Sequence, residues 1–371
     1  MPPQSRRAAD AVAPFNPLAR RRTPALHRLR VAEVCPLTEE SVSITFAVPE
    51  QLREEYRFRP GQHLVLLHPD GRTRRTYSIC SPAGGRLRVG VKRQPGGLFS
   101  TWATTELQAG DELDVMTPMG RFCLDLLPPH TKHYGAIAVG SGITPILSHV
   151  ASVLEVERHS RVTLVYANRT RASTMFSAEL EDLRAQHPDR FAVHHVLSRE
   201  SLPGDHLAGR LGGDLLRELV SSTLPAAGVD EWLLCGPEEV VGEVTAVLTA
   251  LSVPDRSIHR ELFTSQADDL PAEDAGTVVD SEVTIIVRGE KTTLRMGTDE
   301  PSVLDAVLPL RREVPYSCRD GVCATCRALT VEGSLVMRRA TGLDADERGA
   351  GYVLTCQARP TSDRVVLDFD A

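Results

Sequence analysis

The sequence predicts three domains: an antiparallel β-barrel or sandwich, an α/β domain built on a parallel sheet, and a smaller C-terminal α+β unit. The chain has 371 residues, more than one hydrophobic core usually serves. Residues 28–125 hold short alternating apolar runs separated by turn residues, which favours antiparallel strands. In residues 133–263 apolar strands alternate with helical stretches, the pattern of βαβ units. Half of the eight cysteines lie in the C-terminal part, which sets it apart from the other two.

Composition and charge argue against two classes of protein. The chain is 42% hydrophobic and 25% charged, as expected for a globular protein, and its net charge of −7 argues against a nucleic-acid partner. No apolar run is long enough to cross a membrane, and no apolar segment follows the basic start of the chain as in a signal peptide. We therefore expect a cytoplasmic protein with reduced thiols and no membrane partner.

Changes in composition place the domain boundaries. Arginine clusters at the start of the chain, and residues 1–27 are interpreted as a flexible arm rather than a transit-like or anion-binding segment. The first domain then spans 28–128 and the second 129–265. Residues 266–282 contain six acidic and no basic side chains, which predicts a solvated linker. The last domain, 283–371, should contain a hairpin in "VTIIVRGEKTTLRM", a helix capped by the serine of "SVLDAVLPL" and a terminal strand in "DRVVLDFD".

Four cysteines in the last domain have the spacing of a plant-type [2Fe–2S] site. Cys318, Cys323 and Cys326 follow C-x4-C-x2-C, and Cys356 comes later from a separate element. Gly321 and the small residues beside it let the loop turn tightly and leave backbone N–H groups free for the cluster. A structural zinc site is the alternative, but such sites usually show two paired knuckles, and Cys356 stands alone. We also expect a partner protein to dock at the apolar-to-small residues of this loop, Val322, Ala324 and Thr325.

Two segments of the first domain predict a site for a pyrophosphate and an aromatic ring. In "RRTYSIC", Arg75 supplies a fixed guanidinium fork for a phosphate, and Tyr77 can lie against a flat ring. In "VKRQPGGLFSTW", Gly96 and Gly97 permit close backbone approach, and a helix that opens near Ser100 would point its N–H groups at an anion.

A glycine turn in the second domain predicts a nucleotide site. In "VGSGITPILS", Gly140 and Gly142 follow an expected strand and precede an expected helix, with Thr144 as a plausible N-cap and Pro145 at the first helical position. The turn is not the G-x-G-x-x-G fingerprint, so its context carries the prediction.

Four motifs together resemble those of the ferredoxin–NADP reductase superfamily with a C-terminal plant-type ferredoxin domain. They are R-x-Y-S, G-G-x-F-S, G-x-G-x-T-P and the C-G-P of Cys235 to Pro237. The resemblance implies an FAD-binding β-barrel, an NAD(P)-binding α/β domain and a β-grasp ferredoxin domain. It implies that Arg75 binds the pyrophosphate, Tyr77 packs on the isoalloxazine and Ser78 lies near its N5. Ser78, Cys235 and Glu261 are the implied catalytic candidates. Further implied cofactor contacts are Val91, Lys92, Gly96, Gly97, Ser100, Gly140, Gly142, Thr144, Pro145, Asn168, Arg169, Cys235, Gly236, Pro237 and Phe263.

The end of the second strand of the α/β domain favours NADPH over NADH. "VYANRTR" offers Asn168, Arg169 and Arg171 and no acid, and arginine can hold a 2′-phosphate where NAD enzymes tend to place an acid. NADH remains possible, because these arginines can equally be surface residues.

Further motifs are similar to those of the reductase subunits of multicomponent phenylacetyl-CoA epoxidases. They are "GQHLVL", "RTYSIC", "GGLFSTWA", "MTPMGRF", "VPYSCRDGVCATCRA", "EGSLVM" and "GYVLTCQA". The similarity implies electron transfer from NADPH through FAD and a [2Fe–2S] cluster to an oxygenase partner in phenylacetate catabolism. The alternatives are the reductase of a Rieske-type or steroid hydroxylase, a non-enzymatic Fe–S redox sensor, and a zinc-stabilised binding protein.

Overall fold

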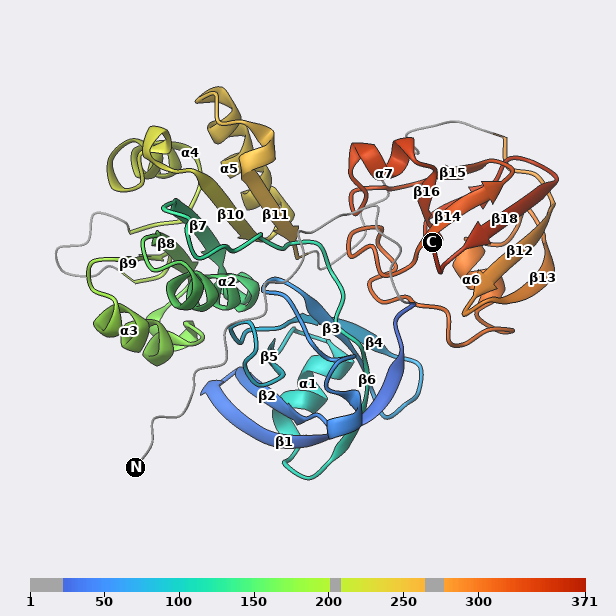
Figure 1. Ribbon diagram of the computed structural model, residues 1–371, viewed down its shortest axis with the longest axis horizontal. Helices are drawn as coiled ribbons and strands as arrows, with labels where there is room; N and C mark the ends of the chain where they lie inside the picture. Colours follow the sequence, from blue (N-terminus) through green and yellow to red (C-terminus); the bar gives the residue numbers. More distant parts are fainter. Residues whose placement is uncertain (1–22, 201–207, 264–276) are drawn as a thin grey trace.

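The computed structural model describes residues 23–200, 208–263 and 277–371, which form three domains (Figure 1). Most of the predicted arm and part of the predicted linker lie outside these residues. Two strands begin before the expected starts of their domains. Leu26 and His27, assigned to the arm, are the first residues of a strand, and Ser281 and Glu282, assigned to the linker, begin another.

The first domain is an antiparallel sheet with strand order β4-β3-β6-β1-β2-β5. A bridge between Ile79 and Val89 joins the two end strands, so the sheet closes into a barrel. Its elements are β1 (Leu26–Thr38), β2 (Ser41–Ala47), β3 (His63–Leu67), β4 (Arg74–Ser78), β5 (Arg88–Lys92), α1 (Leu98–Thr105) and β6 (Glu112–Met116).

The second domain is a parallel sheet with strand order β11-β10-β7-β8-β9. From β7 the chain adds β8 and β9 on one side of the sheet and then β10 and β11 on the other, so the strand order switches between β7 and β10. Ligands of such sheets bind beyond the carboxyl ends of the strands at this switch point. The predicted glycine turn follows β7, and the C-G-P motif lies at the end of β10. The elements are β7 (His133–Val139), α2 (Ile143–Val156), β8 (Arg161–Asn168), α3 (Ser177–Gln186), β9 (Phe191–Leu197), α4 (Gly213–Glu218), β10 (Glu231–Gly236), α5 (Glu238–Ala250) and β11 (Ile258–Leu262).

The start of α2 differs from the prediction. The N-cap is Gly142, and Thr144 and Pro145 lie inside the first turn. The Thr144 hydroxyl donates to the Ser141 carbonyl oxygen at 3.0 Å. Proline is tolerated there because the first-turn N–H groups have no partner within the helix.

The third domain is a mixed sheet with strand order β13-β12-β18-β14-β16, beside a small β15–β17 ladder. The expected hairpin is confirmed, with Arg288 and Gly289 at positive φ in its turn, as is the helix capped by Ser302. The elements are β12 (Ser281–Val287), β13 (Glu290–Met296), α6 (Val303–Val307), β14 (Arg327–Glu332), β15 (Leu335–Met337), α7 (Ala345–Gly349), β16 (Tyr352–Leu354), β17 (Ala358–Pro360) and β18 (Arg364–Asp368).

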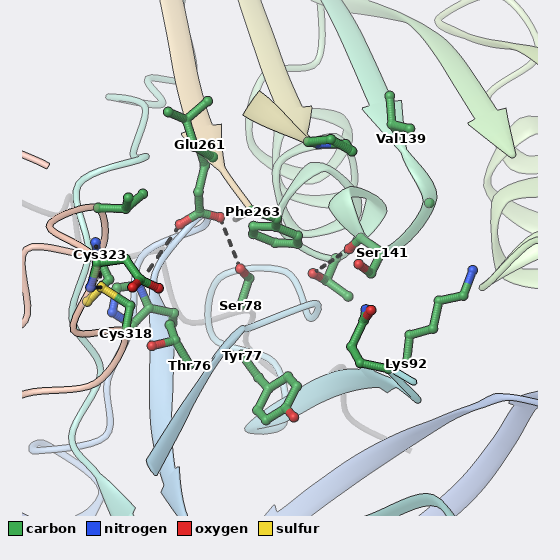
Figure 2. A pocket seen from close by; sticks show the side chains of 18 of the residues that line it. Thr76, Tyr77, Ser78, Lys92, Val139, Ser141, Glu261, Phe263, Cys318 and Cys323 are labelled. Atoms are coloured by element: carbon green, nitrogen blue, oxygen red, sulfur yellow. Dashed lines mark hydrogen bonds and ion pairs between the residues drawn. The ribbon is translucent and has the colours of Figure 1, made fainter. Parts of the chain in front are cut away.

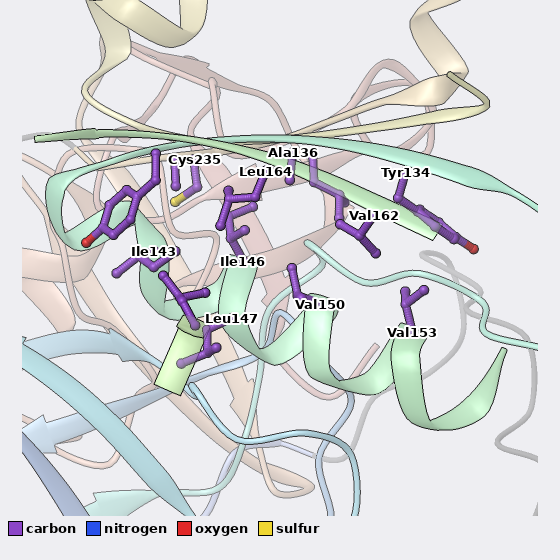
Figure 3. Close-up of a cluster of buried hydrophobic side chains, with 14 of the residues drawn as sticks. Tyr134, Ala136, Ile143, Ile146, Leu147, Val150, Val153, Val162, Leu164 and Cys235 are labelled. Atoms are coloured by element: carbon purple, nitrogen blue, oxygen red, sulfur yellow. The ribbon is translucent and has the colours of Figure 1, made fainter. Parts of the chain in front are cut away.

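The first two domains share a hydrophobic core, whereas the third has its own. Figure 3 shows Ile146 and Val150 of α2 packing against Leu164 of β8. The same cluster includes Phe122 and Leu124, which come from the barrel domain. The core cluster of the third domain contains residues of that domain only. Among the described residues, no helix combines the length and apolar character needed to cross a membrane.

Candidate functional site

A cavity of about 2420 Å³ is lined by residues of all three domains. Pockets for single small ligands are usually about 300–1,000 Å³, so this cavity has room for more than one cofactor. Its lining includes twelve Arg or Lys and six Asp or Glu side chains although the chain is net acidic, so it suits anionic ligands. Figure 2 shows Cys318 and Cys323 on one side, Lys92 on the other, and Ser78, Glu261 and Phe263 between them.

Strand β4 and the loop before α1 form the barrel side of the cavity. Arg75, Tyr77, Gly96 and Gly97 all line it, as the sequence predicts. The Tyr77 ring is held by the ring of Phe99, whose centroid lies 5.4 Å away. Gly96 has φ of 71°, a conformation that favours glycine. The arrangement provides one aromatic wall, one guanidinium and a close backbone, which is what a flavin ring with its phosphates requires.

Ser78 and Glu261 meet at the centre of the cavity, although one belongs to the barrel and the other to β11. The Ser78 hydroxyl donates a 3.0 Å hydrogen bond to the Glu261 carboxylate. His63 of β3 lies on the other side, with Nδ1 3.9 Å from Oε1 of Glu261. Burial raises the pKa of Glu261 to about 7, although the hydrogen bond from Ser78 lowers it. This carboxyl can therefore hold or release a proton near neutral pH.

We expect Glu261→Gln to stabilise the protein at pH 8 but not at pH 4.5. The folded pKa of about 7 exceeds the ordinary value of 4.5, so the native state binds more protons between these values. The neutral carboxyl contributes fully to the free energy of unfolding below pH 4.5. This contribution is lost as the pH rises through 7, which lowers the free energy of unfolding by up to about 3 kcal/mol. Chemical denaturation followed by tryptophan fluorescence measures this, because Trp102 and Trp232 lie in the first two domains.

The matched control is Glu106→Gln, which alters an exposed carboxylate of the barrel domain. If the free energy of unfolding depended on pH in the same way in both variants, the pKa of Glu261 would not be raised.

The far end of the cavity is basic. Lys92 ends β5, and Asn168 and Arg169 follow along the carboxyl end of β8. Burial and the nearby charge of Arg169 lower the pKa of Lys92, so the two cations converge on the same space. Arg171 does not line the cavity, and its backbone N–H donates to Glu200 at 3.1 Å. Lys92 and Arg169 therefore form the part suited to a nucleotide phosphate.

Several predicted cofactor contacts do not line the cavity. Val91 points into the barrel core, and the Ser100 hydroxyl accepts a 3.0 Å hydrogen bond from the Gln94 N–H inside its own loop. Cys235 is buried in the core shared by the first two domains (Figure 3), and burial raises its thiol pKa well above the ordinary value. Its predicted catalytic role is therefore not supported by its position. Gly142, Pro145 and Gly236 also lie away from the lining, whereas Gly140, Thr144, Pro237 and Phe263 belong to it.

The four predicted metal ligands form two pairs. The thiol of Cys318 is hydrogen-bonded to that of Cys323, and the thiol of Cys326 to that of Cys356. The first pair lines the cavity, and the second is buried behind it. The hydrogen bond from Cys323, with help from backbone N–H groups of the loop, lowers the pKa of Cys318 to about 6 despite burial. A thiol with this pKa supplies the thiolate that metals bind.

The paired arrangement fits a two-iron cluster better than zinc. Zinc sites gather four donors around one ion. A [2Fe–2S] cluster instead takes two cysteines at each iron. Arg319, Gly321 and Ala324 have positive φ, which wraps the loop and directs the N–H of Asp320 to the Cys318 sulfur at 3.4 Å.

The sequence did not assign roles to His63, Arg121 or Asp320, which the structure also brings to the cavity. His63 lies in the motif "GQHLVL" and Arg121 in "MTPMGRF", so the signal was present without a reason to select these residues. Val322 and Ala324, expected at a docking face, line the cavity in this arrangement.

Comparisons with known proteins agree with this geometry. Family models match as an oxidoreductase FAD-binding domain (residues 28–123), an oxidoreductase NAD-binding domain (136–245) and a 2Fe-2S iron-sulfur cluster binding domain (285–361). The solved structure of phthalate dioxygenase reductase, a modular structure for electron transfer from pyridine nucleotides to [2Fe-2S], has a similar fold. It has a TM-score of 0.56 and 24% identity, and the match covers 92% of this chain and 98% of that one. The predicted three-domain fold is therefore confirmed.

Two curated relatives match along nearly their whole length. One of the subunits of 1,2-phenylacetyl-CoA epoxidase from Escherichia coli (strain K12) is 41% identical over 357 residues, 93% of this chain and 98% of that protein. The ferredoxin reductase component of 3-ketosteroid-9-alpha-monooxygenase from Rhodococcus rhodochrous is 33% identical over 353 residues, 92% of this chain and 96% of that one. The chain belongs to the family of NAD(P)H-dependent FAD and [2Fe–2S] oxidoreductases that includes the reductase components of multicomponent oxygenases.

Proposed function

We propose that this chain is the reductase subunit of a phenylacetyl-CoA epoxidase and passes electrons from NADPH to its oxygenase partner in phenylacetate catabolism. The observation that carries this assignment is the full-length similarity to the Escherichia coli epoxidase component, at 41% identity against 33% for the steroid monooxygenase component. The cavity supports the same reaction class, because residues suited to a nucleotide, a flavin and a cluster follow one another along it.

The residues of the chain bind and orient, while the bound groups supply the redox chemistry. NAD(P)H is a two-electron donor, FAD can take up two electrons and release them singly, and a [2Fe–2S] cluster accepts one at a time. Arg75 and the N–H groups after Gly96 would hold the FAD pyrophosphate, and Tyr77 would pack against the ring. The four cysteines Cys318, Cys323, Cys326 and Cys356 would hold the cluster.

Ser78 and Glu261 form the pair that would manage a proton at the flavin. Their hydrogen bond fixes the Ser78 hydroxyl at the centre of the cavity, where the nucleotide end and the barrel end meet. A carboxyl with a pKa of about 7 matches the pH at which a proton is best exchanged. Phe263 lines this region and would help to exclude water from it. We therefore assign the two polar side chains a shared role in the nucleotide-to-flavin step.

Arg169 should set the preference for NADPH. We expect Arg169→Gln to lower kcat/KM for NADPH about 10- to 100-fold, the value of one charge-assisted hydrogen bond to a phosphate. The value for NADH should change little, because NADH lacks the 2′-phosphate. Steady-state assays with ferricyanide as acceptor measure both nucleotides.

Arg171→Gln is the control, since this arginine lies on the same loop but outside the cavity lining. Equal losses for NADPH and NADH in Arg169→Gln would mean that Arg169 does not contact the 2′-phosphate.

Anaerobic titration with NADPH and NADH tests the reductase function. Bleaching of flavin absorbance should be followed by the EPR signal of a reduced [2Fe–2S] cluster. Phenylacetyl-CoA-dependent NADPH consumption with the purified epoxidase oxygenase then tests the partner. Transfer to a Rieske-type or steroid oxygenase, with none to the epoxidase, would overturn the specific assignment. Purified protein without flavin would favour a redox sensor, and zinc in place of iron a binding protein.

A further inference from the structure

Arg121 reaches from the barrel domain into the third domain. It follows β6 in the segment "MTPMGRF", for which the proposed function has no use. Its Nη1 lies 3.1 Å from a carboxylate oxygen of Asp344 and also forms an ion pair with Glu347. Its Nη2 donates a 2.7 Å hydrogen bond to the Gly342 carbonyl oxygen. The Glu347 side chain is fully buried, so this cross-domain ion pair is poorly screened by solvent.

The contact made by Arg121 extends to the cysteine loop. The N–H of Gly342 donates a 2.8 Å hydrogen bond to the carbonyl oxygen of Gly321, between the first two predicted cysteine ligands. A Cβ added to Gly342 would lie 2.6 Å from the Val322 carbonyl oxygen, so its backbone packs directly on the loop. A side chain that fixes Gly342 therefore also fixes the direction in which the loop faces.

The described contacts that attach the third domain to the other two are largely polar. The hydrophobic core of the third domain does not include residues of the other two within the described parts of the chain. Arg74 stacks on the Tyr316 ring at 4.1 Å and donates to the carbonyl oxygens of Arg312 and Val314. With so little shared apolar surface, individual charged contacts carry much of the domain placement.

We propose that Arg121 is a positioning residue for electron transfer to the cluster, because its ion pair with Glu347 clamps the cysteine loop toward the barrel end of the cavity. This inference rests on the proposed function. Electron transfer slows steeply with separation, so a loosened clamp slows the flavin-to-cluster step. The nucleotide-to-flavin step takes place between the other two domains and keeps its rate.

A variant of Arg121 is expected to fold. Nη1 of Arg327 lies 2.5 Å from the second carboxylate oxygen of Glu347, so this buried acid stays paired within its own domain when Arg121 is removed. The costly case of an unpaired buried charge does not arise.

The test is Arg121→Gln in the fully loaded protein, with Arg86→Gln as control. Arg86 is an exposed arginine of the same domain whose carboxylate partner, Glu33, lies 3.0 Å away within that domain. Anaerobic stopped-flow should show unchanged flavin reduction and cluster reduction slowed about tenfold, the loss of one charge-assisted contact. Hydrogen exchange should become faster in residues 341–349 and 311–317, the segments of the third domain that Arg121 and Arg74 contact. Arg121→Lys should restore part of the cluster-reduction rate and part of the protection from hydrogen exchange, because lysine keeps the positive charge but lacks the forked guanidinium group.

Several outcomes would overturn the proposal. If Arg121→Gln and Arg86→Gln showed equal rates of cluster reduction and of hydrogen exchange, Arg121 would not hold the third domain in place. Loss of flavin reduction in Arg121→Gln would show that it acts at the flavin instead. If the unaltered protein reduces neither flavin nor cluster, the proposed function fails, and hydrogen exchange alone decides whether Arg121 joins the domains.

Discussion

Replacing Cys323 by serine should stop electron delivery beyond the flavin and leave NAD(P)H-dependent flavin reduction at its normal rate. Cys323 is one of the two cysteines that line the cavity, and its thiol is hydrogen-bonded to that of Cys318. Loss of a group that merely supports a metal ligand costs about 10–100-fold, so loss of a ligand itself should reduce transfer to an oxygenase by more than about 100-fold. Single-turnover absorbance at the flavin band, with EPR of the reduced protein, separates the two steps.

Cys35→Ser is the matched control for this prediction. Cys35 lies in β1, hydrogen-bonded to Glu33 at 3.1 Å, and is not part of the cavity lining. The Cys35 variant should behave as the unaltered protein in both steps. If a folded Cys323→Ser protein also loses flavin reduction, the relay from flavin to cluster is not arranged as proposed.

Gly142→Ala should destabilise the first two domains and weaken nucleotide binding. A Cβ at Gly142 would lie 2.3 Å from the Cys235 carbonyl oxygen and 3.0 Å from the Gly236 nitrogen. Its φ of −61° suits any residue, so the obstacle is purely steric. The clash should push α2 away from β10 at the point where the sheet order reverses and cost about 1–3 kcal/mol. Denaturation followed by tryptophan fluorescence and NADPH titration measure the two effects.

Gly242→Ala is a control with the opposite expected sign. Gly242 lies inside α5, and apart from its chain neighbours and the nearby helix backbone no atom lies within 4 Å of an added Cβ. Alanine there should stabilise the helix by up to about 1 kcal/mol. Equal stabilities for the two variants would mean that the contact between α2 and β10 is not tight.

Local patterns predicted the cysteine site and the glycine turns because their geometry is set within a few residues. The spacing of Cys318, Cys323 and Cys326 is a local property that does not depend on how the rest of the chain folds. Gly140 directly follows its strand. The same locality limits what could be predicted. Val91 and Lys92 are neighbours on β5 and face opposite sides, so strand alternation alone could have excluded Val91.

Other residues could not be placed from the sequence for physical reasons. Strand β10 is buried on both faces, so its apolar run does not reveal that Cys235 points into the core and not toward a ligand. His63 meets Glu261 only because barrel and sheet pack together, and nearly 200 residues separate them in the chain. The cross-domain contacts of Arg121 depend on domain placement in the same way.

Because the third domain has a separate hydrophobic core, damage to its cluster should leave the other two domains intact. Nucleotide and flavin sites lie in a unit with its own shared core, so loss or oxidation of the cluster should leave that unit folded. A damaged molecule would then still draw electrons from the cellular nucleotide pool without delivering them to a product. Such a molecule would waste reductant and expose reduced flavin to oxygen.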